Sequence, residues 1–240
     1  MDLNDINLIK KYLPEDKWDN AINKLKTGYP VQYLIGNVEF YNTIIDVTED
    51  VLIPRFETEY LVSDLIKLIK ENNIINPDIL DIGTGSGAIA IALKKNYPSF
   101  VTGIDKSAKT IDLAKKNSKK NKTNIMFLNT AIEDYTSTIK YDVIVSNPPY
   151  VGINEYVDPK TKYEPGDAIY APKDDELYFY RIILEKSTTL LKKPGIIAFE
   201  IGKAQKDTLL PLAKEFYPTA KMIQKKDLNG LDRYFYIINE

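Results

Sequence analysis

ILDIGTGSGAIAIALKK, residues 79–95, joins a short apolar run to a glycine-rich turn and then to an amphipathic helical pattern. Three glycines in five residues, Gly83, Gly85 and Gly87, let the backbone turn tightly and approach a ligand where a Cβ atom would collide. The helix that follows offers unpaired N–H groups at its first turn. This stretch therefore predicts a strand–loop–helix unit that holds a ligand.

Strand-like and helix-like patterns alternate after this unit. The sequence predicts strands over 78–82, 100–104, 124–129, 141–146 and 195–201, and helices near 86–96, 107–120, 176–192 and 203–216. Such alternation predicts a parallel sheet with right-handed crossovers and helices on both faces. The final strand-like stretches, 220–224 and 233–238, lie too close together for a helical crossover, so they should pair antiparallel.

The N-terminal part of the chain has a different pattern. Residues 1–28 predict one or two short helices that end at Gly28. The stretch 31–53 is rich in β-branched and aromatic residues and carries turn signals at 36–37 and 41–42, so we expect hairpin-like strands there. After Pro54, apolar residues at helical spacing predict a further helix.

The composition restricts the chemistry that the protein can perform. Its 240 residues include neither cysteine nor histidine, which excludes disulfides, thiolate nucleophiles, Ser-His triads and almost every zinc site, so no metal site is expected. The sequence has no apolar run of membrane-spanning length and does not begin like a signal peptide. The net charge of −2 argues against bulk capture of nucleic acid, and the lysine-rich run 115–122 is typical of a solvated helix face.

Acidic residues follow the second and third predicted strands. Asp105 closes the strand FVTGID, where a carboxylate can accept both ribose hydroxyls of a nucleotide cofactor. Together with the glycine loop it predicts an adenosine-containing cofactor, and leaves NAD and S-adenosylmethionine both open. Further along, Glu133 or Asp134 could reach the adenine amino group, and a solvated loop acid is the alternative interpretation of either.

The fourth predicted strand ends in Asn147-Pro148-Pro149-Tyr150, which taken alone is a turn signal. At the carboxyl edge of a parallel sheet, however, this turn should face the ligand of the glycine loop. The Asn147 side-chain oxygen and the Pro148 carbonyl can accept both N–H bonds of a planar amide and aim its nitrogen at an electrophilic methyl group. Tyr150 supplies an aromatic wall. Because hydride transfer needs no such arrangement, the turn favours methyl transfer to an amide-like nitrogen, with Asn147, Pro148 and Tyr150 as catalytic residues.

From about residue 30 to its end, the chain resembles the HemK family of peptide-chain release factor N5-glutamine methyltransferases, class I enzymes that use S-adenosylmethionine. Residues 30–62 resemble the family's linker hairpin and its Pro-Arg-x-Glu-Thr-Glu signature, and DIGTGSGAIAIAL and SNPPYV resemble its cofactor and substrate-amide loops. YEPGDAI (163–169), EIGKAQ (200–205) and DLNGLDR (227–233) match its later landmarks.

The resemblance implies an α/β fold, that of a class I S-adenosylmethionine-dependent methyltransferase (Rossmann-like), with a mostly parallel seven-stranded sheet. It also implies three parts: a short helical N-terminal segment (1–29), a β-hairpin linker (30–54) and the methyltransferase domain (55–240). Two features depart from the family pattern. The helical segment is shorter than the family's several dozen residues, and YAPKDDELYFY (170–180) lacks the glycines that the family carries there.

Carried over to this sequence, the resemblance assigns roles to individual residues. The cofactor site would comprise Gly83, Thr84, Gly85, Ser86, Gly87, Asp105, Glu133 or Asp134, and Asn147. The substrate amide would be held by Asn147, Pro148, Pro149 and Tyr150. The segment 54–59 should line the cofactor side of the cavity, and Arg233 is expected to be a fold-stabilising ion-pair partner.

The implied reaction is methyl transfer from S-adenosylmethionine to the glutamine of the Gly-Gly-Gln motif of a class I release factor. The implied enzyme is a cytoplasmic monomer that contacts no membrane and binds no nucleic acid directly. Three alternatives remain at this point: an N-methyltransferase acting on an exocyclic amine of an rRNA, tRNA or DNA base, a non-catalytic scaffold that binds an adenosine cofactor, and a nicotinamide oxidoreductase.

Overall fold

Seven strands form one sheet in the computed structural model, which describes residues 2–153, 155–203 and 205–240. The strands lie in the order β5-β4-β3-β6-β7-β9-β8. Their bounds are β3 (Asp78–Ile82), β4 (Phe100–Asp105), β5 (Met126–Asn129), β6 (Tyr141–Ser146), β7 (Leu191–Glu200), β8 (Lys221–Lys226) and β9 (Asp232–Asn239). Strands β3 to β7 are parallel, while β9 runs antiparallel to both β7 and β8, which confirms the expected sheet and its antiparallel final pair.

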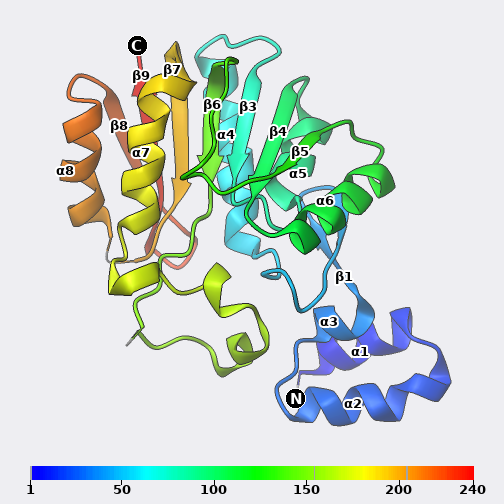
Figure 1. Ribbon diagram of the computed structural model, residues 1–240. Coiled ribbons are helices and arrows are strands. Elements are labelled where there is room, and N and C mark those ends of the chain that lie inside the picture. Colours follow the sequence, from blue (N-terminus) through cyan, green and yellow to red (C-terminus); the bar gives the residue numbers. More distant parts are fainter. Residues whose placement is uncertain (1, 154, 204) are drawn as a thin grey trace.

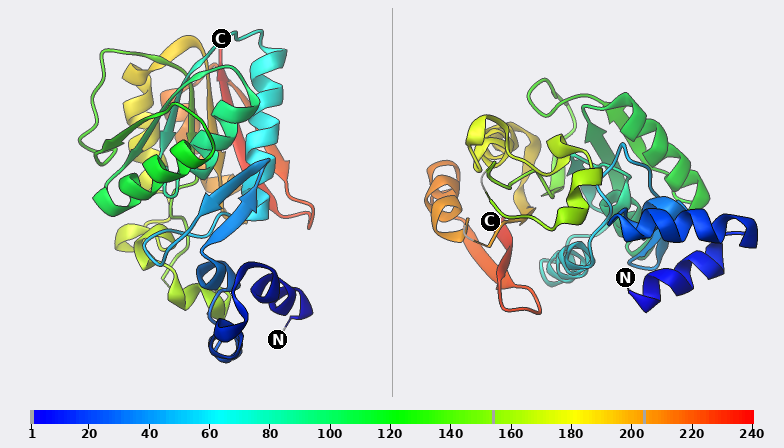
Figure 2. Two further views of the ribbon diagram at one scale, coloured as in Figure 1. Left: turned by 90° about the vertical axis from the view of Figure 1, so that its right-hand side faces the viewer. Right: turned by 90° about the horizontal axis from the view of Figure 1, so that it is seen from below.

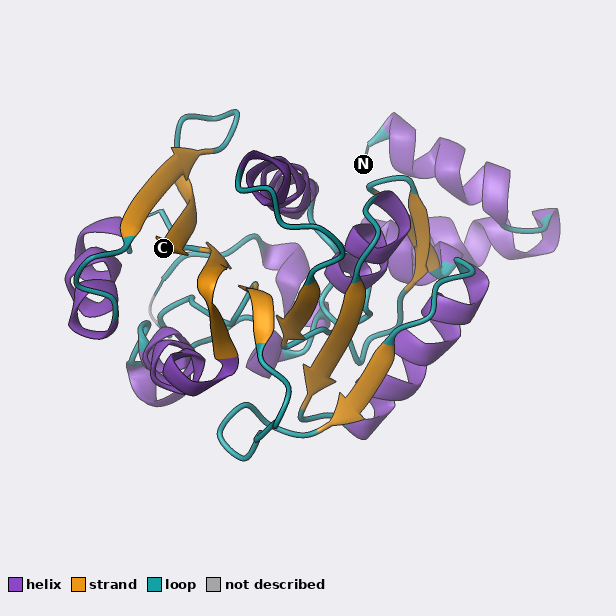
Figure 3. Cartoon of the chain, turned by 90° about the horizontal axis from the view of Figure 1, so that it is seen from above, coloured by secondary structure: helices purple, strands orange, loops and turns teal. Residues whose placement is uncertain are grey.

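Helices cover both faces of this sheet (Figure 3). On one face lie α4 (Phe56–Glu71), α5 (Ala88–Asn96) and α6 (Ala108–Lys120), and on the other lie α7 (Tyr178–Leu190) and α8 (Lys206–Phe216). The central strand β6 shows why its middle residues, 143–145, are all apolar. Val143 and Val145 pack into the core beneath α4 and α5, whereas Ile144 packs with α7. The helix expected near 203–216 begins at Lys206, and Ala204 lies outside the described residues.

The N-terminal part contains α1 (Leu3–Tyr12), a short 3-10 turn η1 (Glu15–Lys17), α2 (Trp18–Lys26), α3 (Val31–Ile35) and a hairpin of β1 (Asn37–Phe40) and β2 (Thr43–Asp46). The hairpin turn at 41–42 is confirmed, since Tyr41 and Asn42 both have positive φ.

The strand expected at the start of this region was wrong, because residues 31–35 form the helix α3. Gly36 ends that helix in the left-handed conformation, and its N–H bonds to the Gln32 carbonyl at 2.8 Å, so it does not turn a hairpin. Val31 packs with α1 and α2, and this tertiary contact overrides the β preference of its short segment.

A long connection, described over residues 147–153 and 155–177, lies at the carboxyl ends of the strands, below the sheet in Figure 1. Its described residues include the 3-10 turns η2 (Pro159–Tyr163), η3 (Gly166–Ala168) and η4 (Pro172–Asp174). Its Tyr163 packs edge-on against Tyr29 at 5.0 Å and hydrogen-bonds Thr27, so the N-terminal part and this connection lie side by side (Figure 2). Among the helices of the described residues, none is long and apolar enough to cross a membrane.

Candidate active site

The glycine loop, Asp105 and the Asn-Pro-Pro-Tyr turn leave the sheet at one edge. Ile82 of β3 lies opposite Ile104 of β4 and opposite Ser146 of β6, and the Ser146 hydroxyl donates to the Ile82 carbonyl at 2.8 Å. The residues that directly follow these three positions, Gly83, Asp105 and Asn147, therefore start from neighbouring points of the sheet. From β3 the chain passes to β4 and β5 on one side of β3, and then crosses back to β6 on the other side. The carboxyl ends of β3 and β6 therefore form a topological switch point, where open α/β sheets bind ligands.

The glycines of the loop have two different functions. Gly83, Gly85 and Gly87 all have positive φ. A Cβ atom on Gly83 would meet no atom within 4 Å, and one on Gly85 would meet only a backbone oxygen at 3.9 Å, so the space above both is open. A Cβ on Gly87 would instead press against Ile91, Ala114 and Phe127 within 3.1–3.3 Å. The first two glycines thus border an open space, named the glycine cradle below, while Gly87 allows the loop to pack on α6 and β5.

Asp105 lies directly against this cradle. Its carboxylate accepts the Gly85 N–H and the Ser107 N–H, each at 3.0 Å. Burial raises the pKa of Asp105, and these two N–H groups oppose that shift by stabilising the charged form. A carboxylate beside an open glycine cradle is compatible with the ribose end of an adenosine cofactor, and this role of Asp105 stays a prediction.

A second carboxylate lies beneath the loop, and no sequence motif pointed to its role. Asp81 is buried, and its Oδ2 accepts the Thr84 hydroxyl at 2.6 Å and the Ala90 N–H at 3.2 Å. Its Oδ1 has no hydrogen-bond partner within the described part of the chain, and burial raises its pKa to about 7. Because the Thr84 hydroxyl points inward to Asp81, any contact of Thr84 with the cofactor would come from its backbone.

The remaining predicted cofactor acids lie farther along the same edge. Asp105 of β4 lies opposite Asn129 of β5, and the Thr130 N–H donates to the Asp105 carbonyl at 2.9 Å. Glu133 and Asp134 follow in an exposed turn. Both acids are therefore on the correct side of the sheet, and which of them contacts adenine stays a prediction.

The Asn-Pro-Pro-Tyr turn lines a cavity of about 340 Å³. Leu52 and Arg55 line the same cavity from the segment before α4, and Glu200, Gly202 and Arg233 line it from the carboxyl end of β7 and the start of β9. Tyr150 is fixed at several points. Its hydroxyl accepts from Arg233 Nη1 at 3.2 Å and donates to Glu200 at 3.4 Å, and its carbonyl accepts from Gln205 Nε2 at 2.9 Å.

Two buried side chains that sequence reasoning did not single out lie behind Asn147. Thr58 of α4 is within 3.4 Å of the Asn147 amide nitrogen, and its hydroxyl donates to Glu200 Oε2 at 2.7 Å. Thr58 belongs to the segment 54–59, which was expected to line the cofactor side of the cavity, and Glu200 belongs to the EIGKAQ landmark, but neither residue was assigned a role of its own. The ion pair expected for Arg233 is confirmed, since its Nε lies 3.3 Å from Asp227.

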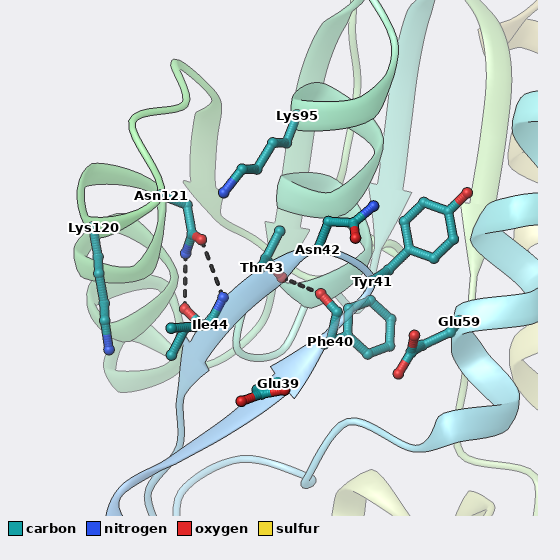
Figure 4. Close-up of a pocket in the computed structure, with 10 residues that line it drawn as sticks. All are labelled: Glu39, Phe40, Tyr41, Asn42, Thr43, Ile44, Glu59, Lys95, Lys120 and Asn121. Carbon is teal, nitrogen blue, oxygen red and sulfur yellow. Dashed lines mark hydrogen bonds between the residues drawn. The ribbon is translucent and has the colours of Figure 1, made fainter.

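A larger cavity of about 570 Å³ lies elsewhere, between the β1–β2 hairpin and the ends of α5 and α6 (Figure 4). Its lining includes Glu39, Glu59, Lys95 and Lys120, and Asn121 binds the backbone of Ile44 across it with bonds of 3.2 and 2.8 Å. The residues that line it include Glu59 of the segment 54–59, but none from the glycine loop, Asp105, Glu133, Asp134 or the Asn-Pro-Pro-Tyr turn. The cavity beside Asn147 is therefore the candidate active site.

Comparison with known proteins agrees with this geometry. A family described as "Methyltransferase small domain" matches residues 54–158. A release factor glutamine methyltransferase of Flavobacterium psychrophilum is 40% identical over 226 residues, which cover 90% of this chain and 78% of that protein. One from Enterococcus faecalis is 37% identical, with coverage of 91% and 79%. The chain belongs to the release factor glutamine methyltransferase family.

Solved structures support the fold of this family member. A 16S rRNA methyltransferase of T. thermophilus, in complex with AdoMet and guanosine, superposes with a TM-score of 0.64 at 15% identity, over 85% of this chain and 50% of that one. A methyltransferase from Pyrococcus furiosus superposes with a TM-score of 0.59 at 20% identity, over 92% and 96% of the two chains. Together with the relatives and the family match above, the fold confirms the expected class: the protein is a methyltransferase of class I fold that uses S-adenosylmethionine, and the oxidoreductase and scaffold alternatives are not favoured.

Proposed function

We propose that this protein transfers a methyl group from S-adenosylmethionine to the side-chain amide nitrogen of the glutamine in the Gly-Gly-Gln motif of a class I peptide-chain release factor. One observation carries the proposal. Asn147 begins the turn beside the glycine cradle, because Ile82 and Ser146 lie opposite each other in β3 and β6, and it also lines the cavity of about 340 Å³. An amide that enters this cavity meets acceptor oxygens next to the cofactor site.

The residues of the turn supply orientation. The Asn147 Oδ1 and Pro148 carbonyl oxygens would each accept one N–H of the substrate amide, which holds the –NH2 group and directs its lone pair. Proline has no N–H, so neither Pro148 nor Pro149 introduces a donor that would compete with the substrate. The Tyr150 ring would form a wall for the planar amide.

The cofactor site would be formed by the loop from Gly83 to Gly87 and by Asp105, with Glu133 or Asp134 at the adenine end. When bound, S-adenosylmethionine supplies a sulfonium-activated methyl group as the electrophile. The attacking nitrogen loses its proton only after it has become positively charged, so the site needs no strong general base, in keeping with a sequence that lacks histidine.

We further propose a monomeric enzyme that acts in the cytoplasm, where release factors work, with the release factor as its protein partner and without direct nucleic-acid binding. The base N-methyltransferase alternative is not favoured. Relatives 40% and 37% identical to this chain are named as release factor enzymes, whereas the rRNA enzyme shares the fold at only 15% identity. The division into a helical segment (1–29), a linker (30–54) and a methyltransferase domain (55–240) also remains a proposal.

The test uses purified protein, methyl-labelled S-adenosylmethionine and a recombinant class I release factor, with mass spectrometry of the peptide that contains Gly-Gly-Gln. One added methyl group on that glutamine is expected, and Asn147→Ala should abolish it. Asn124→Ala, which removes an exposed amide before β5, is the matched control and should transfer normally. Transfer to RNA or DNA with none to the release factor would overturn the proposal.

A further inference from the structure

The orientation of the Asn147 amide decides whether the proposed site works. Its Oδ1 accepts an N–H bond, whereas its Nδ2 donates, and a rotation by half a turn exchanges the two. With Nδ2 toward the substrate, two donor groups would face each other, and the –NH2 of a bound glutamine would lose the acceptor that aligns its nitrogen for attack. Asn147 is half-buried and lines the cavity, so some neighbouring group has to fix the orientation.

The neighbours of Asn147 form a chain of hydrogen bonds with a defined direction. Asn147 Nδ2 lies 3.4 Å from the Thr58 hydroxyl oxygen, and that hydroxyl lies 2.7 Å from Glu200 Oε2. A hydroxyl has one proton. Because an ionised carboxylate can only accept, Thr58 must give this proton to Glu200 and can then only accept from Asn147. The amide nitrogen is thereby held toward Thr58, and Oδ1 is left for the substrate.

The other oxygen of Glu200 is constrained in the same sense. Arg233 can only donate, and its Nη1 lies 3.2 Å from the Tyr150 oxygen. The Tyr150 hydroxyl in turn donates to Glu200 Oε1 at 3.4 Å. Glu200 thus accepts hydrogen bonds at both of its carboxylate oxygens. These bonds are shielded from water, because Glu200 is only 3% exposed and Thr58 only 4% exposed.

We infer that Thr58 and Glu200 are positioning residues that set the hydrogen-bonding direction of Asn147, so that its Oδ1 and not its Nδ2 faces the substrate amide. The inference rests on the proposed function for its kinetic consequence, but the hydrogen-bond relay itself is a property of the free protein. Neither side chain touches the reacting atoms. Each acts through Asn147.

Protonation of Glu200 would reverse the relay, because a neutral carboxyl can donate to Thr58, and Thr58 can then donate to Asn147 Oδ1. Burial raises the pKa of Glu200, while Thr58 and the Arg233 charge oppose the rise. Several titratable or charged groups face Glu200 from the surrounding elements: Glu57 on α4, Tyr150 in the turn, Tyr180 on α7, and Arg233, Tyr234 and Tyr236 on β9. The hydrogen-bond direction of the relay should therefore reverse as the pH falls, on the acid side of the pH profile of kcat.

Two variants separate a directional relay from a merely structural contact. Thr58→Val removes the relay and leaves the Asn147 amide free to take either orientation, so kcat should fall about tenfold, the worth of one well-placed hydrogen bond. In Glu200→Gln, Tyr150 still donates to Oε1, so Nε2 faces Thr58 and donates to it. The amide of Asn147 is then held the wrong way round, and kcat should fall about a hundredfold.

KM for the release factor and the affinity for S-adenosylmethionine should change little in both variants. Thr58→Ser keeps the hydroxyl and should restore most of the wild-type kcat. Thr188→Val, the same change as Thr58→Val on the exposed face of α7, is the matched control and should leave kcat unchanged. Equal losses of kcat in Thr58→Val and Glu200→Gln, or losses confined to KM, would overturn the relay.

Nuclear magnetic resonance of protein with 15N-labelled asparagine tests the relay without any substrate. The side-chain signal of Asn147, assigned by its absence in Asn147→Ala, should shift with pH as Glu200 takes up a proton. Thr58→Val and Glu200→Gln should each abolish that shift. A signal that titrates equally in all three proteins would overturn the inference. If the wild-type protein transfers no methyl group to the release factor, the proposed function fails, and this measurement still decides the relay.

Discussion

Arg55 Nη2 lies 2.6 Å from Glu164 Oε1 and joins the segment before α4 to the connection beneath the sheet, 109 residues later in the chain. The other carboxylate oxygen of Glu164 accepts the Ile53 N–H at 3.0 Å. The Glu164 side chain is 2% exposed and that of Arg55 is 36% exposed. One buried carboxylate thus holds together two of the segments that line the candidate active site.

Glu164→Ala should lower the free energy of unfolding by about 1–3 kcal/mol, because it leaves the Ile53 N–H and the Arg55 charge without their partner. The half-exposed arginine can turn to water, which keeps the cost below that of breaking a fully buried pair. KM for the release factor should rise several-fold, since Arg55 and Leu52 line the cavity. Urea unfolding and steady-state kinetics provide the measurements.

Glu71→Ala is the control for this prediction. It breaks the exposed pair between Lys67 and Glu71 on α4, and should change the free energy of unfolding by less than about 0.5 kcal/mol. If Glu164→Ala were as mild as this control, Glu164 would not hold the two segments together.

The glycines near the loop should separate into two classes of variant. Gly83→Ala places a methyl group at φ +69° in open space, so it should cost about 1–2 kcal/mol of stability and weaken S-adenosylmethionine binding by obstructing the cradle. Gly103→Ala would put its Cβ 2.8 Å from the Phe127 ring and 2.9 Å from the Thr84 hydroxyl, so stability should fall more. Calorimetric titration measures the affinity for S-adenosylmethionine and thermal unfolding measures the stability, so the two together distinguish the Gly83 and Gly103 variants. If Gly83→Ala weakened S-adenosylmethionine binding no more than its loss of folding stability accounts for, the result would contradict the cradle.

The success of the sequence prediction depended on how local each feature is. The glycine loop and the Asn147 turn are contiguous motifs, and the strands around them are short apolar runs, so residues alone located the edge where they meet. The contact between Thr58 and Glu200 spans 142 residues and arises from the packing of α4 against β7, which no local pattern reports. The helix α3 was missed for a related reason: five residues are too few for a periodicity to decide, and the packing of Val31 with α1 and α2 decided instead.

Asp105→Ala should weaken S-adenosylmethionine binding about 10- to 100-fold. It removes the carboxylate expected on the ribose and also the acceptor of the Gly85 and Ser107 N–H groups, and each charge-assisted hydrogen bond is worth roughly 1.5–3 kcal/mol. Calorimetric titration measures the affinity. An unchanged affinity would show that the cofactor lies elsewhere.

The pair Glu133→Gln and Asp134→Asn should reveal which acid contacts adenine. Both side chains lie in the exposed turn after β5, so neither change should alter stability by more than about 0.5 kcal/mol. The variant at the contacting position should weaken S-adenosylmethionine binding about 3- to 10-fold, the worth of one hydrogen bond, and the other serves as its control. Wild-type affinity in both variants would show that neither Glu133 nor Asp134 contacts adenine.

Asp81 should give the cofactor-free protein a pH-dependent stability. Its pKa in the folded state is about 7 against an ordinary value of 3.8, so between about pH 4 and pH 7 the folded protein binds more protons than the unfolded chain. The free energy of unfolding should therefore fall as pH rises through this window, by up to about 1.4 kcal/mol per pH unit, and stay low above it. D81N removes the titrating group and should flatten the slope, leaving a smaller one of the same sign from Asp105 and Glu200, whose pKa values burial also raises. Urea unfolding at pH 5, 6, 7 and 8 measures it, with D112N on the exposed face of α6 as control. Equal slopes in D81N and the wild-type protein would show that the buried carboxylate keeps its charge throughout this window.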